Sequence, residues 1–154
     1  MNFSVVENEN SKAVFGLCQK SNDRTQARDI PALSKRFHKA VGMGRGEVIP
    51  FFVISKDYDE RTKDFQLFVG GLLENDNLKA FIIPKGLYGK VTVKPKLGFL
   101  WGPAIGEAKR RFYMEWLPKS GYSSRCMEYE YHAEASIGRT PQIDILFAIE
   151  KRAE

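Results

Sequence analysis

The sequence predicts an α+β fold of two tandem strand-helix-strand-strand modules, whose antiparallel sheets carry both helices on one side. Two stretches have apolar residues at one helical spacing: Ile30, Leu33, Phe37 and Val41, and Ile105, Ala108, Phe112 and Trp116. Stretches of alternating apolar and polar residues, which are typical of strands, surround both helices. The order strand, helix, strand, strand occurs twice along the chain, which indicates a duplicated module.

Length and composition favour one domain, 1–154, with module one at about 1–76 and module two at about 77–154. The 43% of hydrophobic residues suffices for a core, and no apolar run approaches the ~20 residues that span a bilayer. Met1 to Asn10 is polar and acidic, unlike a signal peptide. We expect Cys18 and Cys126 to be buried free thiols in a cytoplasmic protein without a membrane partner.

The net charge of +5 raises the question of nucleic-acid binding. The densest basic run is Lys109-Arg110-Arg111, which stands beside Glu107 and Glu115 in a helical pattern and is interpreted as a solvated helix face. There is no zinc-finger spacing or RNA-recognition signature, so direct nucleic-acid binding is not expected. The two histidines and two cysteines match no metal site, and we expect no metal or cofactor.

The first module begins with a strand at 12–20 and a polar loop at 21–28. Asp29 stands where a helix N-cap belongs, Pro31 fits the first turn, and the helix at 30–41 ends before a glycine-rich turn. The continuous apolar run at 49–55 predicts a strand that is buried on both faces. A hairpin tip then connects it to a strand at 64–74, in which Gly70-Gly71 indicates a bulge or a close approach of backbones.

The second module contains strands at 80–83 and 88–94, joined by the turn Pro84-Lys85-Gly86. Pro103 is expected to open the second helix, and Pro118 with Gly121 to end it. The remaining strands are expected at 125–132 and 142–150, with a turn at 138–141 between them.

The strand at 125–132 is unusual because it carries two carboxylates in its middle, where Glu is normally depleted. Strand side chains alternate between faces, so two sets result. One face carries Cys126, Glu128, Glu130 and His132, and the other carries Met127, Tyr129 and Tyr131. Such carboxylates either lie solvated at a sheet edge or serve a function.

Five segments, in order along nearly the whole chain, resemble the GyrI-like, AraC-type effector-binding superfamily, and in particular the stand-alone integron-cassette effector-binding proteins. They are Ile30–Phe37 (IPALSKRF), Asp57-Tyr58 followed by Phe68–Gly71 (FVGG), Ile83–Tyr88 (IPKGLY), Tyr113–Trp116 (YMEW) and Glu128–His132 (EYEYH).

This resemblance implies pseudo-twofold symmetry between the modules and a ligand pocket in the cleft where they meet. It also implies that Glu130 lies at the base of the pocket. Two positions depart from the family pattern: His132 replaces a Tyr, and Ser34 replaces a Trp that is common on the first helix. The lining therefore differs, and the family's ligand preference does not carry over directly.

A carboxylate in an apolar pocket is stabilised when a cation arrives, and aromatic rings add apolar area and cation-π attraction. We expect Glu128 at the rim, His132 as a hydrogen-bonding residue, and His38 exposed on the polar side of its helix. The candidate aromatic lining is Phe52, Tyr58, Phe68, Tyr88, Trp101, Tyr113 and Trp116. Tyr88 and Trp116 are the preferred members because they fall in the matching segments.

The leading hypothesis is a stand-alone receptor for cationic or amphipathic organic molecules. The length is used up by the effector-binding fold, so no DNA-binding part is expected, and any protein partner is unidentified. An enzyme is the less favoured alternative: a hydrolase of reactive small molecules, with Glu130 as general base and His132 assisting. A third alternative is a protein-interaction module that inhibits a topoisomerase, against which the +5 charge argues.

Overall fold

The computed structural model describes residues 1–44, 47–48, 50–94 and 101–153, with the side chain of Trp101 outside the described part. The strands are β1 Ser4–Asn8, β2 Lys12–Asn22, β3 Phe51–Lys56, β4 Asp64–Gly71, β5 Lys79–Ile83, β6 Gly86–Val93, β7 Tyr122–His132 and β8 Ile143–Lys151. The helices are α1 Gln26–Val41, α2 Trp101–Arg111, the π-helical segment η1 Phe112–Trp116, α3 Leu117–Lys119 and the 3-10 turn η2 Glu134–Ser136.

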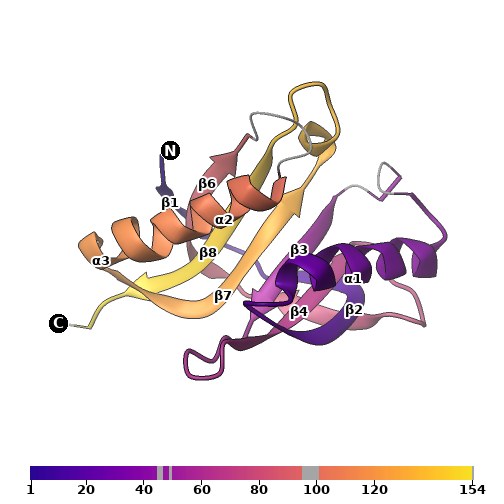
Figure 1. The fold of residues 1–154 in the computed structure, drawn as a ribbon, viewed down its shortest axis with the longest axis horizontal. Coiled ribbons are helices and arrows are strands. Elements are labelled where there is room, and N and C mark those ends of the chain that lie inside the picture. Colours follow the sequence, from indigo (N-terminus) through magenta and orange to yellow (C-terminus); the bar gives the residue numbers. More distant parts are fainter. Residues whose placement is uncertain (45–46, 49, 95–100, 154) are drawn as a thin grey trace.

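All described strands join one antiparallel sheet in the order β1-β6-β8-β7-β3-β4-β2-β5. This order is the same read from either edge when β2, β3 and β4 of module one correspond to β6, β7 and β8 of module two. The pseudo-twofold axis therefore passes between β3 and β7, which pair at the centre. Both long helices lie on one side of the curled sheet, as the sequence predicts (Figure 1).

Each helix buries its predicted stripe against its own half of the sheet. Leu33 and Phe37 of α1 pack on β3 and β4, and Ala108 and Phe112 pack on β6 and β8. The opposite, concave face has a third core without a helix above it, in which Tyr88 is fully buried. Strand β3 contributes alternate residues to the core under α1 and to the core on the concave face, which confirms its predicted burial on both faces.

The helix boundaries differ from the sequence prediction. Helix α1 begins at Gln26, with Thr25 at the N-cap position, so the prediction of Asp29 as N-cap is wrong. The Asp29 carboxylate instead accepts hydrogen bonds from the Thr25 and Ser21 hydroxyls, at 2.7 and 2.8 Å, and these bonds hold its pKa below the usual value. The second helix begins at Trp101, before Pro103, and continues through Pro118 to Lys119.

Strand β1 is absent from the sequence prediction. Its residues are largely exposed because it forms one edge of the sheet and pairs only with β6. Under the pseudo-symmetry β1 corresponds to β5 at the other edge, so each module receives one additional strand from a segment outside its own strand-helix-strand-strand unit.

Gly70 lies opposite Gly16 where β4 and β2 pair, and a Cβ at Gly70 would be 2.6 Å from the carbonyl oxygen of Phe15. The predicted close approach of backbones is therefore confirmed. Both cysteines are free, as expected, but the prediction of burial is wrong: Cys126 is exposed and Cys18 is half-buried. Cys126 has φ 59° inside a bulge that interrupts the β7–β8 pairing, so it stands outside the predicted alternation.

Candidate functional site

Strand β7 is central in the sheet, paired with β3 on one side and β8 on the other. Beyond the bulge its side chains alternate as the sequence predicts. Met127, Tyr129 and Tyr131 enter the concave core. Glu128, Glu130 and His132 lie on the helix face, along the line where the two modules meet. A central strand therefore carries two carboxylates away from any sheet edge.

A polar cluster joins this strand to the second helix. We call it the seam, and it consists of Lys109, Tyr113, Glu128, Glu130 and His132. The Lys109 Nζ lies 3.2 Å from Glu128 Oε2 and 4.0 Å from Glu130 Oε2. The Tyr113 hydroxyl donates to Glu128 Oε1 at 3.2 Å. His132 Nε2 is 3.2 Å from Glu130 Oε1, within hydrogen-bond distance.

Burial decreases from the floor of the seam to its rim. The side chains of Glu130 and His132 are 6% and 8% exposed, whereas those of Glu128 and Lys109 are 15% and 20% exposed. Glu130 is the buried carboxylate of the described part of the chain. This gradient agrees with the expectation that Glu130 lies deeper than Glu128, although the role of either acid in ligand binding stays a prediction.

The seam is electrostatically coupled. Burial alone would lower the pKa of Lys109, but the Glu128 and Glu130 carboxylates more than offset it, so the pKa lies above its usual value and the amine is charged. Burial and the Glu128 carboxylate raise the pKa of Tyr113 well above its usual value, which keeps the phenol neutral as a donor.

An aromatic row continues the seam toward α1. The rings of His132 and Phe51 stack 4.5 Å apart at 8°, and His38 meets Phe51 edge-on at 5.2 Å. The His38 Nδ1 donates to the Ser34 carbonyl at 2.7 Å, and its buried Nε2 has no hydrogen-bond partner among the described residues. The prediction of an exposed His38 is therefore wrong, because the ring is half-buried against β3.

The structure brings Glu128, Glu130, His132 and Tyr113 together, but it separates the other candidates from them. The rings that lie on the concave face, on the other side of the sheet from Glu130, are Phe52, Phe68 and Tyr88. Tyr58 lies at the β3–β4 hairpin and donates to Asp23 at 2.6 Å. Trp116 packs with Phe112 and Phe3 beyond the other end of the seam. The side chain of Trp101 is outside the described residues.

Sequence reasoning missed Lys109, Phe51 and His38. The surface interpretation of the basic run is confirmed for Arg110 and Arg111, which pair with Glu107, but it is wrong for Lys109. A signal was present, because Lys109 and Tyr113 stand four residues apart beside the core stripe of the helix. Two polar groups on one helix flank, opposite two strand acids, are the pattern that identifies the seam.

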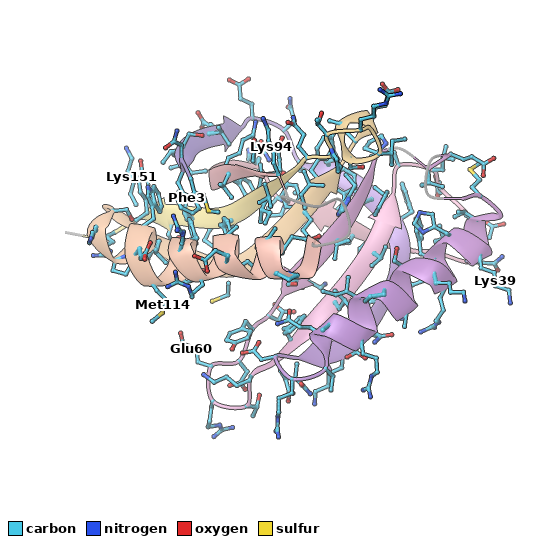
Figure 2. The ribbon with its side chains drawn as sticks, turned by 45° about the horizontal axis from the view of Figure 1, so that its top comes forward. Phe3, Lys39, Glu60, Lys94, Met114 and Lys151 are labelled. Atoms are coloured by element: carbon cyan, nitrogen blue, oxygen red, sulfur yellow. The ribbon has the colours of Figure 1, made fainter. Side chains whose placement is uncertain are left out.

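A groove of about 370 Å³ lies apart from the seam, where the N-terminal residues meet η1 and α3. Figure 2 shows Phe3 close to the helical stretch that contains η1, from which Met114 projects outward. The lining residues are Met1, Phe3, Arg111, Glu115, Trp116, Lys119 and Ser120. Trp116 is thus the candidate aromatic that lines this groove.

No group of three or more histidine, cysteine or acidic side chains in the described ranges is placed to hold a metal ion. None of the helices within those ranges has the length and apolarity of a bilayer-spanning segment.

Solved structures with this fold cover nearly the whole chain. The integron cassette protein VCH_CASS2 of Vibrio cholerae has a TM-score of 0.70 at 11% identity and covers 96% of this chain and 95% of its own. SAV2435 bound to tetraphenylphosphonium has a TM-score of 0.72 at 9% identity and covers 97% and 94%. The C-terminal domain of EcmrR has a TM-score of 0.59 at 16% identity and covers 98% of both chains.

A larger match has a different coverage. The alignment with EcmrR in an EcmrR–DNA complex covers 98% of this chain but 58% of the EcmrR chain, with a TM-score of 0.60 at 14% identity. Neither a protein-family profile nor a curated protein sequence matches the chain. The likeness therefore lies in the fold, which this chain shares with VCH_CASS2, SAV2435 and the C-terminal domain of EcmrR.

Proposed function

We propose that this protein is a receptor for lipophilic organic cations, which it binds at the seam with Glu130 at the base of the site. The observation that carries the proposal is the pair of carboxylates on a central strand, of which Glu130 is 6% exposed. A buried carboxylate costs free energy unless a cation or hydrogen-bond donors compensate it. A strand that keeps two such groups side by side provides a site for positive charge.

The surroundings of the carboxylates favour an organic cation over a hydrated inorganic one. The Tyr113 ring contacts Glu128, and the His132 ring, which stacks on the buried Phe51, contacts Glu130, so each acid has aromatic area beside it. Aromatic faces attract cations whose charge is spread over an apolar body. SAV2435, which shares the fold, has been solved with tetraphenylphosphonium, a cation of this kind. This neighbour supports the proposal at the level of ligand class.

The same seam offers less support for hydrolysis. A general base must take up a proton. Glu130 lies 4.0 Å from the Lys109 ammonium and 3.2 Å from His132 Nε2, so a cation and a ring already lie beside the carboxylate where a reacting water would have to be held. The arrangement suits attraction of a cation better than activation of water.

The proposal extends to cellular context. Two free thiols fit the reducing cytoplasm of a bacterium, and a site built on charge and ring area suits several cations, as multidrug binding requires. EcmrR, which has been solved in a complex with DNA, carries this fold as its C-terminal domain. The small-molecule cation is thus the proposed partner.

Calorimetric titration with tetraphenylphosphonium tests the proposal. Wild-type protein is expected to bind it, and Glu130→Gln is expected to bind about 10–100-fold more weakly, because a charge-assisted contact is replaced by a neutral one. Glu150→Gln is the matched control, since Glu150 is an exposed acid on the neighbouring strand β8. Equal affinity of the Glu130→Gln and Glu150→Gln variants would refute the proposed role of Glu130.

A further inference from the structure

Lys109 places a cation of the chain itself against the carboxylates of the seam. Its side chain is 20% exposed, whereas those of the next two residues, Arg110 and Arg111, are 52% and 43% exposed. Helix α2 thus turns one of three consecutive basic residues inward, over β7. The ammonium is charged, so the seam combines two carboxylates with one internal positive charge.

The contacts are unequal in a way that bears on exchange. Lys109 is close to Glu128, at 3.2 Å, and is at the 4.0 Å limit of an ion pair with Glu130, the deeper acid. Glu130 is held from its other side by His132, at 3.2 Å. The lysine therefore lies closer to the rim acid than to the floor acid, so its ammonium is held mainly at the more exposed end of the seam.

Lysine is suited to such a reversible contact. Its ammonium is a compact, strongly hydrated charge on a flexible four-carbon stem, and it needs no fixed bidentate geometry. Residue 109 already reaches solvent in part, beside the exposed Arg110. A change of side-chain rotamer can carry the ammonium from the carboxylates into water while the helix stays in place.

We propose that Lys109 is a displaceable internal counter-ion: it occupies the cationic position of the seam in the free protein, and a ligand cation binds by replacing it. This inference rests on the proposed function and adds which cations the site can bind. A tethered ammonium competes at an effective concentration in the millimolar range or above. Small ammonium ions lose that competition, and only cations with enough apolar surface to add burial on the rings succeed.

The test measures the dissociation constant of tetraphenylphosphonium by calorimetry for wild type, Lys109→Met and the double variant Lys109→Met/Glu128→Gln. The double variant removes the internal cation together with one carboxylate, so the net charge of the seam is the same as in wild type. It also leaves Tyr113 an acceptor, because the glutamine carbonyl can take the hydroxyl hydrogen bond that Glu128 accepts. If Lys109→Met is unfolded by circular dichroism, the double variant alone carries the comparison.

Displacement predicts that the double variant binds tetraphenylphosphonium at least about tenfold more tightly than wild type, although net charge is unchanged. It also predicts that tetramethylammonium binds the double variant and not wild type at millimolar concentration. Lys90→Met is the control, since Lys90 forms a half-exposed pair with Asp144 on the sheet and should leave the affinity unchanged.

The outcomes separate the two ideas. Equal affinity of wild type and double variant for tetraphenylphosphonium, with a loss in Glu130→Gln, overturns displacement and leaves the cation receptor intact. Binding by the double variant and none by wild type would show that Lys109 blocks the seam permanently, which overturns displacement and the wild-type receptor. Absence of binding by all variants that fold overturns both displacement and the receptor.

Discussion

Lys109→Met should destabilise the fold far more than loss of a surface lysine. The substitution leaves two carboxylates, 15% and 6% exposed, side by side without their shared cation. Removing one partner of a buried ion pair costs about 3–5 kcal/mol, and an exposed pair contributes about 0–1 kcal/mol. Because Lys109 is one-fifth exposed, water recovers part of the loss, and we expect the free energy of unfolding at pH 7 to fall by about 2–4 kcal/mol.

Urea unfolding followed by circular dichroism measures this change, with Lys90→Met as the surface control. Glu128→Gln in the Lys109→Met background should restore part of the loss, since one of the unpaired charges is then removed. The cycle of single and double variants gives the coupling between Lys109 and Glu128 directly. A loss of less than about 0.5 kcal/mol in Lys109→Met, no larger than a typical surface substitution, would refute the reasoning that the seam is a buried ion cluster.

Two further predictions concern the rest of the fold. Burial, followed by the neighbouring Tyr129, raises the pKa of Tyr88 to about 12, above the unfolded value of about 10. The neutral phenol therefore contributes stability that is complete below about pH 10 and is lost as the pH rises toward 12. The measurement is tyrosinate absorbance against pH for wild type and Tyr88→Phe, whose difference is the ionisation of Tyr88. Ionisation of Tyr88 that is complete by about pH 10.5 would contradict this expectation. Gly70→Ala places a Cβ 2.6 Å from the Phe15 carbonyl oxygen, so we expect the free energy of unfolding to fall by about 1–3 kcal/mol. Thermal unfolding measures this change. An unchanged melting temperature would show that the β2 and β4 backbones can move apart at this point without cost.

Periodicity was enough to predict both helices and most strands. The stripes at 30–41 and 105–116 enter their cores as expected, because the 3.6-residue repeat leaves only one face that can be buried. The edge strand β1 escaped prediction because an edge strand with largely exposed side chains leaves no alternation to detect. The predicted start of α1 was too late because Asp29, the predicted N-cap, lies inside the first turn. From there its carboxylate accepts hydrogen bonds from the Thr25 and Ser21 hydroxyls.

The candidate site was predictable only as far as a single strand. Alternation placed Glu128, Glu130 and His132 on one face of β7, and the structure confirms that placement. Alternation within one strand does not show whether the aromatic rings of a neighbouring strand lie on the same face of the sheet as the acids. Phe52 is opposite Tyr131 in the β3–β7 register, which sends it to the concave side, whereas Val53 is opposite Glu130. The spacing of Lys109 and Tyr113 places both on one flank of the helix, but their contact with the acids depends on the direction of α2 across β7, which helical spacing alone does not give.

The claim that the seam selects positive charge is tested most directly by a pair of ions of the same shape and opposite charge. Calorimetry with tetraphenylphosphonium and tetraphenylborate on wild-type protein holds apolar area constant and changes only the sign of the charge. The buried carboxylates predict that the phosphonium binds at least about a hundredfold more tightly than the borate, since one ion gains and the other loses an electrostatic contact. Equal affinities, or preference for the borate, would show that ring area alone governs binding and would contradict the account.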